Sequence, residues 1–192
     1  ALINGDDPYL RRIVARDYRV VRVGIREPDV DLKAEAIRED LSGLYFEADG
    51  VLFHFKWPGI HNVYNCLIAI WIGRYYHLDD TAIQAGLDAF VPSGNRMQIA
   101  EVGGLRFVND AYNANPESMR AAMDTVCAVA EGRKIAVLGD MFEIGENAEA
   151  WHRAVGEYAG THMDVLIGVG EWAENLCEGA RGAAPNHPAV AA

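Results

Sequence analysis

Apolar and polar positions in the first part of the chain alternate with a period of two. From Val51 to Trp57 every second residue is a large apolar one, which predicts a half-buried strand. An earlier strand end at Leu2-Ile3 runs into a polar turn sequence, Asn-Gly-Asp-Asp-Pro. Similar short patterns predict further strands at Arg19–Ile25, Lys33–Asp40 and Gly43–Asp49.

The period then becomes helical. Val63, Leu67, Ile70 and Trp71 fall on one stripe of a helix predicted over residues 62–76. A second helix is predicted over Thr81–Phe90, with Asp79 or Asp80 as its N-cap. The first part of the chain therefore combines short strands with two helices.

A new pattern begins after Pro92–Gly94. Asn115-Pro116 predicts a helix start, because Asn is a good N-cap and Pro suits the first helical position. This alternation of strands and helices predicts an α/β domain with a mostly parallel sheet. The predicted elements are a hairpin of Met97–Val102 and Leu105–Asn109 about Gly103-Gly104, strands at Lys134–Leu138 and Asp164–Val169, and helices at Ala148–Ala159 and from Glu171. The tail Gly179–Ala192, rich in Ala, Pro and Gly, is expected to add no closing strand.

Composition and charge narrow the class of protein. The 192 residues are 51% hydrophobic, which suits a packed globular chain. Lys and Arg number 17 against 28 Asp and Glu, for a net charge of −11, so nucleic acid is a poor partner. The three cysteines lack metal-type spacing and favour reduced thiols in a cytoplasmic protein. No apolar run is long enough for a membrane span, and the opening residues lead us to expect no signal peptide.

Familiar catalytic and nucleotide-binding motifs are missing from the sequence. It contains no GxxxxGK[ST] phosphate loop, no GxSxG nucleophile elbow and no metal-ligand spacing among its His and Cys residues. Gly168-Val169-Gly170 matches only part of a dinucleotide-binding GxGxxG. The candidate chemistry therefore rests on three polar clusters.

The first cluster, Gly59–Asn65 (GIHNVYN), lies at the start of a predicted helix. A side-chain amide there offers both a donor and an acceptor to the edge of an adenine ring. Simple capping of the helix by Asn62 is the structural alternative. The second cluster, Ser93–Arg96, places Arg96 at the junction of two predicted domains, where it could contact a phosphate or merely face solvent.

The third cluster is the run Asn109–Pro116 (NDAYNANP), at the carboxyl end of a predicted strand. Open α/β sheets bind ligands at that edge, and Asp110 could accept hydrogen bonds from ribose hydroxyls. An ordinary capped turn is the alternative interpretation.

Taken in order, GIHNVYN, GNR, NDAYNANPESM and AVLGDMFEIGE resemble the Mur ligase family over essentially the whole chain. Tyr112–Pro116 and the GDM-x-E-x-G loop (Gly139–Gly145) are similar to the members that add D-Ala-D-Ala. The resemblance implies that residues 1–93 form the last part of a central ATPase-type α/β domain. Residues 94–192 would then form most of a Rossmann-like carboxyl-terminal domain.

The resemblance also implies roles for individual residues. Asn62 and Asn65 match positions near adenine, Arg96 matches an arginine that reaches the ATP phosphates, and Asp110 matches the acidic residue at the ribose. Tyr112, Asn113 and Asn115 match the run that lines the cleft, and Asp140 and Glu143 lie on a loop that could bind the incoming dipeptide. His61 is expected to be structural, and His152 either matches a family position or is a packed histidine of a helix.

The implied reaction joins D-Ala-D-Ala to UDP-MurNAc-tripeptide through an acyl phosphate, using ATP and Mg²⁺, in peptidoglycan precursor synthesis. The resemblance places the phosphate loop and the metal ligands before Ala1, so the 192 residues alone are expected to be inactive. A monomer is expected. Two alternatives stay open: a non-catalytic nucleotide-binding or partner-binding module, and a folate-type glutamyl ligase, against which Tyr112–Pro116 argues.

Overall fold

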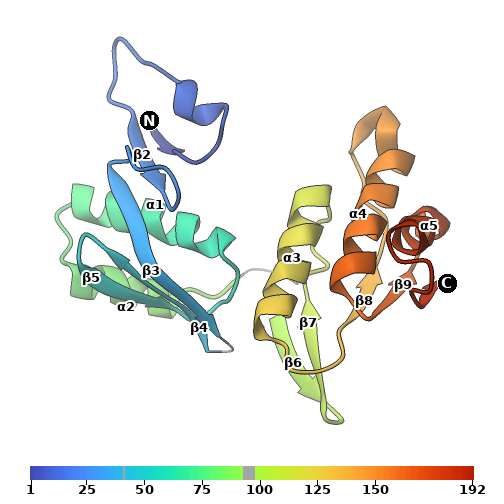
Figure 1. Cartoon of the computed structure of the whole chain (residues 1–192). Coiled ribbons are helices and arrows are strands. Elements are labelled where there is room, and N and C mark those ends of the chain that lie inside the picture. Colours follow the sequence, from blue (N-terminus) through green and yellow to red (C-terminus); the bar gives the residue numbers. More distant parts are fainter. Residues whose placement is uncertain (41, 93–97) are drawn as a thin grey trace. The chain divides into compact units, whose positions relative to one another are not determined.

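Two units make up the chain, Ala1–Val91 (unit 1) and Pro92–Ala192 (unit 2), in a computed structural model (Figure 1). The structure describes residues 1–40, 42–92 and 98–192. The domain boundary predicted between residues 93 and 94 lies outside these ranges, and so does Arg96.

Unit 1 is built on a five-stranded sheet in the order β1-β2-β3-β4-β5. The first three strands are parallel, and the last three form an antiparallel meander. The strands are β1 (Leu2–Asn4), β2 (Val21–Gly24), β3 (Leu32–Asp40), β4 (Gly43–Ala48) and β5 (Val51–Phe55), with a short 3₁₀ turn, η1 (Leu10–Arg12), between β1 and β2. Asp49 and Gly50 both have positive φ in the two-residue turn between β4 and β5, as a type I′ hairpin requires.

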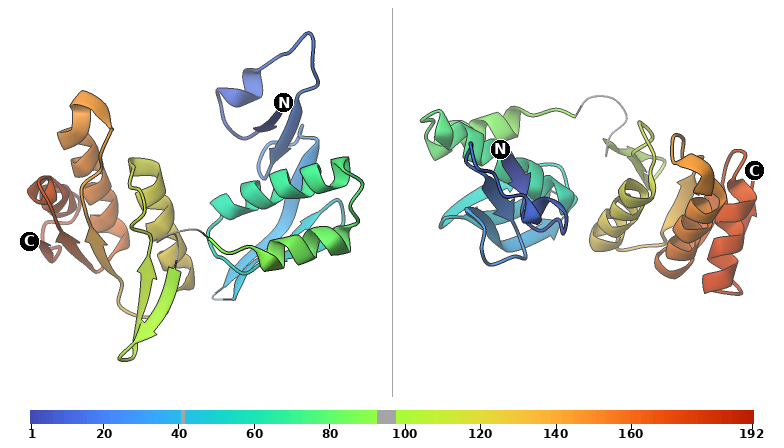
Figure 2. Two further views of the ribbon diagram at one scale, coloured as in Figure 1. Left: turned by 180° about the vertical axis from the view of Figure 1, so that it is seen from behind. Right: turned by 90° about the horizontal axis from the view of Figure 1, so that it is seen from above.

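Helices α1 (His61–Tyr75) and α2 (Asp80–Ala89) lie side by side over one face of this sheet (Figure 2). The predicted stripe of α1 is confirmed, since Val63, Leu67 and Ile70 are fully buried in the unit 1 core. The alternation in β5 is confirmed as well, because Phe53 and Phe55 are buried and Leu52 is exposed. Asp79 caps α2 by accepting a hydrogen bond from the Ala82 N–H.

Unit 2 holds a separate hairpin and a three-stranded parallel sheet in the order β10-β9-β8, which confirms the predicted α/β class. Gly103 and Gly104 turn the hairpin with positive φ, as predicted. The strands are β6 (Gln98–Val102), β7 (Leu105–Asn109), β8 (Ile135–Leu138), β9 (Val165–Gly168) and β10 (Ala189–Ala191). The helices are α3 (Pro116–Val129), α4 (Ala148–His162) and α5 (Ala173–Ala183), with the 3₁₀ turn η2 (Gly145–Asn147) before α4.

Helices α4 and α5 approach each other through glycines. A Cβ added at Gly156 would lie 2.0 Å from the Leu176 carbonyl oxygen, and one at Gly179 would lie 2.1 Å from the Arg153 carbonyl oxygen. Such distances leave no room for a side chain at either position. The two helices therefore pack backbone against backbone and bury Val155 and Leu176 completely in the unit 2 core.

The expectation for the tail was wrong. Helix α5 continues to Ala183, and β10 adds a parallel strand beside β9. The Gly179 that made this segment resemble a loop is the residue that lets α5 approach α4. The predicted start of this helix at Glu171 is also wrong by two residues, because α5 begins at Ala173.

One face of the parallel sheet of unit 2, here called the open face, carries exposed apolar side chains among the described residues. Ile135, Val137 and Val190 are 53%, 64% and 58% exposed, whereas Ala136 and Leu166 on the other face are buried among the helices. Within the described residues β8 is an edge strand. Parallel strands are usually apolar on both faces because helices cover both faces of the sheet. The open face has this apolar composition, although its side chains are exposed.

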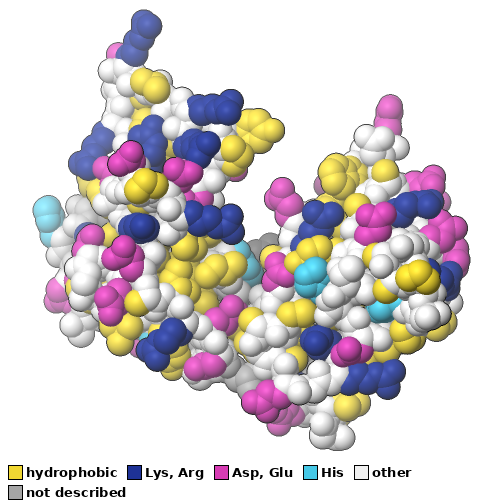
Figure 3. Space-filling model, viewed as in Figure 1, with side chains coloured by type: hydrophobic (Ala, Val, Ile, Leu, Met, Phe, Trp, Pro, Cys, Tyr) yellow, Lys and Arg dark blue, Asp and Glu magenta, His cyan; other side chains and the backbone are white. Residues whose placement is uncertain are grey.

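Surface charge is mixed on both units. Arginines gather over the segment between β1 and β2 with acidic side chains among them (Figure 3), and Arg11 pairs with Glu27 while Arg19 pairs with Asp31. Among the described residues, no helix is long and apolar enough to cross a membrane.

Candidate functional site

The first turn of α1 brings Asn62 and Asn65 together. The Asn62 side-chain N–H donates to the Pro58 carbonyl oxygen at 2.9 Å, and the Asn65 side-chain N–H donates to the Asn62 oxygen at 3.2 Å. Asn62 is half-buried and Asn65 is exposed. The chain that leads into the helix therefore orients Asn62, and Asn62 in turn orients an amide that faces solvent.

The capping interpretation of Asn62 is wrong. Ile60 occupies the N-cap position of α1, and it makes no side-chain hydrogen bond there. Asn62 lies inside the first turn instead, where its amide reaches back to Pro58. The side chain of Asn62 thus joins the segment before α1 to the Asn65 amide instead of capping the helix.

Asp6 ties the same helix to the strand ends. Its carboxylate accepts hydrogen bonds from the backbone N–H groups of Ile25 (2.7 Å) and Glu27 (2.8 Å), and from the Tyr64 hydroxyl at 2.7 Å. Burial acts to raise the pKa of Asp6, but these donors outweigh it and lower the pKa. Burial and the bond to Asp6 raise the pKa of Tyr64 to about 12, so the hydroxyl stays protonated as a donor.

Glu39, at the end of β3, contacts the segment that precedes α1. Its carboxylate accepts a hydrogen bond from the Gly59 N–H at 2.5 Å. Burial raises the pKa of Glu39 although this bond acts in the opposite direction. Two carboxylates, Asp6 in the turn after β1 and Glu39 at the end of β3, therefore hold the start of α1.

In unit 2 the predicted start of α3 is confirmed at atomic detail. The Asn115 side-chain oxygen accepts from the Ser118 N–H at 2.8 Å, and the Ser118 hydroxyl accepts from the Asn115 N–H at 3.1 Å. This reciprocal pair is a capping box with Pro116 in the first turn. The capped-turn interpretation therefore describes Asn115, whose amide oxygen is used within the helix end.

The other members of this run lie on the loop between β7 and α3. Asp110 is half-buried, Asn113 is exposed and Tyr112 is 60% exposed. Ala114, between Asn113 and the cap, packs against the unit 2 core that contains Met141. The loop after β7 and the loop after β8 therefore share one core cluster.

Asp140 follows β8 and binds the loop after β9. Its two carboxylate oxygens accept hydrogen bonds from the Glu171 N–H at 2.9 Å and the Trp172 N–H at 3.0 Å. Gly170 has φ +109°, and a Cβ there would lie 2.5 Å from an Asp140 oxygen. The Gly168-Val169-Gly170 motif therefore makes room for Asp140, and both oxygens of that carboxylate are used inside the protein.

His152 is fully buried in α4 and fixes the residue after Asp140. Its Nε2 accepts the Met141 N–H at 2.8 Å, and its Nδ1 lies 2.7 Å from the Ala148 carbonyl oxygen. Packing inside the helix pair is thus the role that the geometry supports. Glu143, two residues beyond Met141, is exposed and has φ +60°.

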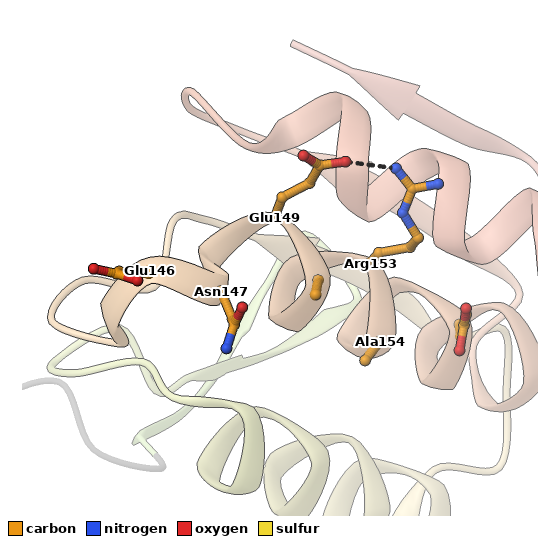
Figure 4. A pocket seen from close by; sticks show the side chains of 7 residues that line it. Glu146, Asn147, Glu149, Arg153 and Ala154 are labelled. Carbon is orange, nitrogen blue, oxygen red and sulfur yellow. Dashed lines mark hydrogen bonds and ion pairs between the residues drawn. The ribbon is translucent and has the colours of Figure 1, made fainter.

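A metal cluster or a pocket could also mark a site among the described residues. No group of three or more His, Cys, Asp or Glu side chains among the described residues could hold a metal ion. Figure 4 shows a shallow depression of about 340 Å³ on α4, where Arg153 pairs with Glu149 at 3.0 Å. It contains none of the predicted site residues. The candidate residues form two separate groups, one at the start of α1 in unit 1 and one on the loops after β7 and β8 in unit 2.

Sequence reasoning missed Asp6, Tyr64 and Glu39, although the first two lie within runs that it singled out. The Asn-Gly-Asp-Asp run after β1 signals a turn, and nothing in it indicates that Asp6 reaches a helix 58 positions away. The sequence signal that could have indicated Asp6 and Glu39 is the presence of polar residues at the carboxyl end of a predicted strand.

Two family models match the chain. One described as "Mur ligase middle domain" matches residues 1–73, and one described as "Mur ligase, glutamate ligase domain" matches residues 95–191. Over 181 residues the chain is 30% identical to the UDP-N-acetylmuramoyl-tripeptide–D-alanyl-D-alanine ligase of Bacillus subtilis, covering 92% of this chain and 39% of that protein. It is 37% identical over 118 residues to the Escherichia coli protein of the same name, covering 59% and 25%.

These relatives are much longer than the chain, which spans 39% or less of their length. Among solved structures, the MurF ligase from Thermotoga maritima in complex with ADP is similar over 100% of this chain and 43% of that one. Its TM-score is 0.80 at 21% sequence identity, so the two share a fold.

Proposed function

Because the chain belongs to the Mur ligase family, we propose that the complete protein is an ATP-dependent ligase that joins D-Ala-D-Ala to UDP-MurNAc-tripeptide. The observation that supports this most is the 30% identity to a ligase of that name over 92% of the chain. Residues Tyr112–Pro116 and the loop Gly139–Gly145 lie inside the aligned length and carry the D-Ala-D-Ala-type pattern.

The reaction forms an acyl phosphate and then an amide. The terminal carboxylate of the tripeptide attacks the γ-phosphorus of ATP, and ADP leaves. The amine of D-Ala-D-Ala then attacks the acyl carbon, and the tetrahedral intermediate expels inorganic phosphate after the amine loses a proton. Such chemistry needs positioning and neutralisation of charge around the phosphoryl group more than it needs a protein nucleophile.

Unit 1 supplies groups suited to an adenine ring. Asn65 is exposed and is held by Asn62, which is itself bonded to Pro58. A fixed carboxamide can donate to and accept from one edge of a purine. We assign Asn65 the direct contact with adenine and Asn62 a contact or an orienting role.

Unit 2 supplies the remaining proposed contacts. Asp110 would accept from the ribose hydroxyls, and Tyr112, Asn113 and Asn115 would line the substrate cleft. Asn115 would do so alongside its capping bond, which uses only the amide oxygen. Arg96, outside the described residues, would neutralise the ATP phosphates.

The wider context follows from the same family membership. Residues 1–93 would form the carboxyl-terminal part of the central ATP-binding domain, and residues 94–192 the carboxyl-terminal Rossmann-like domain. Mg²⁺ would accompany ATP, with ligands outside this chain. We further propose a monomeric cytoplasmic enzyme of peptidoglycan precursor synthesis.

Phosphate release by the complete protein tests the proposal. The assay contains Mg-ATP and UDP-MurNAc-tripeptide, with and without D-Ala-D-Ala. Release that depends on the dipeptide, with a ligated product of the expected mass, would support the ligase. Nucleotide binding without dipeptide-dependent release would favour the non-catalytic module and remove the catalytic assignment of Arg96.

A further inference from the structure

Two aspartates tie β8 to β9 at opposite ends of the strand pair. Asp164 accepts a hydrogen bond from the Lys134 N–H at 2.7 Å at the amino ends. Asp140 accepts from the N–H groups of Glu171 and Trp172 at the carboxyl ends. Ligands of parallel α/β sheets bind at the carboxyl ends. Only the Asp140 tie therefore lies at the edge where a substrate would be expected.

His152 adds a second tie at that edge. Nε2 accepts the Met141 N–H, and Nδ1 faces the Ala148 carbonyl oxygen, so this hydrogen-bond pattern places the ring hydrogen on Nδ1. The ring also stacks on Trp172, with the ring centroids 5.5 Å apart and the planes 21° apart. Trp172, which donates its N–H to Asp140, thus also packs on His152, and His152 in turn accepts the N–H of Met141.

These hydrogen bonds fix Asp140 and Met141, the root of the loop Gly139–Gly145. The next two residues, Phe142 and Glu143, form the tip of the loop and are exposed to solvent. Met141 is 2% exposed, whereas Phe142, the next residue, is 77% exposed. Glu143 follows with φ +60°, a backbone conformation that residues other than glycine rarely adopt. An exposed tip on a fixed root, at the carboxyl edge of a parallel sheet, can present its side chains to a ligand.

We propose that Asp140 and His152 are positioning residues that hold this loop for the amine substrate, and that the tip makes the contact. The inference rests on the proposed ligase function. It changes the role expected for Asp140, since both of its oxygens are bonded within the protein. Glu143 offers a carboxylate for an ammonium group, and Phe142 offers an apolar surface for the methyl groups of a small dipeptide.

Steady-state kinetics of the complete protein test this assignment. We expect Asp140→Asn and His152→Leu to raise the KM for D-Ala-D-Ala by roughly tenfold or more, because small displacements of positioning groups have effects of that size. The KM for Mg-ATP should stay within about twofold of the wild-type value. His152→Gln keeps an acceptor for the Met141 N–H, so it should recover most of the loss.

Two matched controls separate position from residue type. Asp164→Asn changes the same residue type at the other end of the same strands, and His162→Gln removes another imidazole from α4. Both should leave the KM for D-Ala-D-Ala unchanged. Hydrogen exchange gives a readout without turnover: the Met141 amide should exchange faster in His152→Leu than in His162→Gln. Asp140→Asn and His152→Gln carry the test if His152→Leu does not fold.

The outcomes are distinct. Equal rises in the KM for D-Ala-D-Ala and the KM for Mg-ATP would overturn the positioning role. So would an unchanged KM for D-Ala-D-Ala together with faster exchange of the Met141 amide. Either result would leave Asp140 and His152 a role in folding alone. Wild-type protein without dipeptide-dependent phosphate release would instead overturn the proposed ligase, and the inference with it.

Discussion

Replacing Asp6 by Asn should destabilise unit 1 in a way that depends on pH. The carboxylate accepts from the N–H groups of Ile25, Arg26 and Glu27 and from the Tyr64 hydroxyl. An Asn side chain has one oxygen, so whichever way it turns, its NH₂ group faces a backbone donor. At least one charge-assisted hydrogen bond is lost, and the free energy of unfolding should fall by about 2–3 kcal/mol.

The sign of the pH effect follows from the lowered pKa of Asp6. The unfolded carboxyl has its ordinary pKa of 3.8, and the folded one has a lower value. The stabilisation is therefore fully present above pH 3.8 and is lost as the pH falls through the folded pKa. The difference between wild type and Asp6→Asn should be largest at neutral pH and should shrink in acid.

Urea denaturation of the 192-residue chain, followed by circular dichroism, measures both effects. Asp17→Asn is the matched control, since it removes the same charge from an exposed position in the same unit. Thermal unfolding gives a second readout: at about 4–8 °C per kcal/mol for a unit of this size, the melting temperature of unit 1 should fall by roughly 8–24 °C. Equal stability of the two variants at neutral pH, or a difference that does not change in acid, would refute the reasoning.

Three further predictions concern other elements. Gly156→Ala should lower the free energy of unfolding of unit 2 by roughly 3 kcal/mol or more, because the new Cβ would meet the Leu176 carbonyl oxygen; an unchanged urea midpoint would contradict this. Asn115→Ala should cost about 1 kcal/mol through the lost cap, measured the same way, and a neutral effect would count against the capping box. In the complete protein Asn65→Ala should raise the KM for ATP by about tenfold while Asn186→Ala should not, and similar KM values in phosphate-release assays would remove the adenine assignment.

Local patterns were sufficient where a single element determines the outcome. The alternation in β5, the buried stripe of α1 and the Gly103-Gly104 hairpin depend on neighbouring residues, and the structure confirms them. The Asn115 cap depends on residues three positions apart, and it too is confirmed. Fold class and the positions of the candidate loops could thus be predicted from the sequence.

Long-range partners could not be predicted in this way. The Asp6 carboxylate accepts a hydrogen bond from Tyr64, 58 positions later in the chain, and Asp140 accepts one from Glu171, 31 positions later. Helix and strand periodicity relates only residues within one element, so it does not predict such pairs. The tail was misjudged for a related reason. Gly179 lowers the intrinsic helix propensity of α5, but close packing against α4 compensates for it. Tertiary contact decided these cases.

The open face of the unit 2 sheet has a consequence for the chain in solution. Strand β8 is an edge strand within the described residues, and it carries the exposed apolar side chains of Ile135 and Val137. Such an edge can template strand addition from another molecule. Self-association of the isolated 192-residue chain should therefore increase with protein concentration, and a charged side chain at position 137 should reduce it without disturbing the helices on the opposite face.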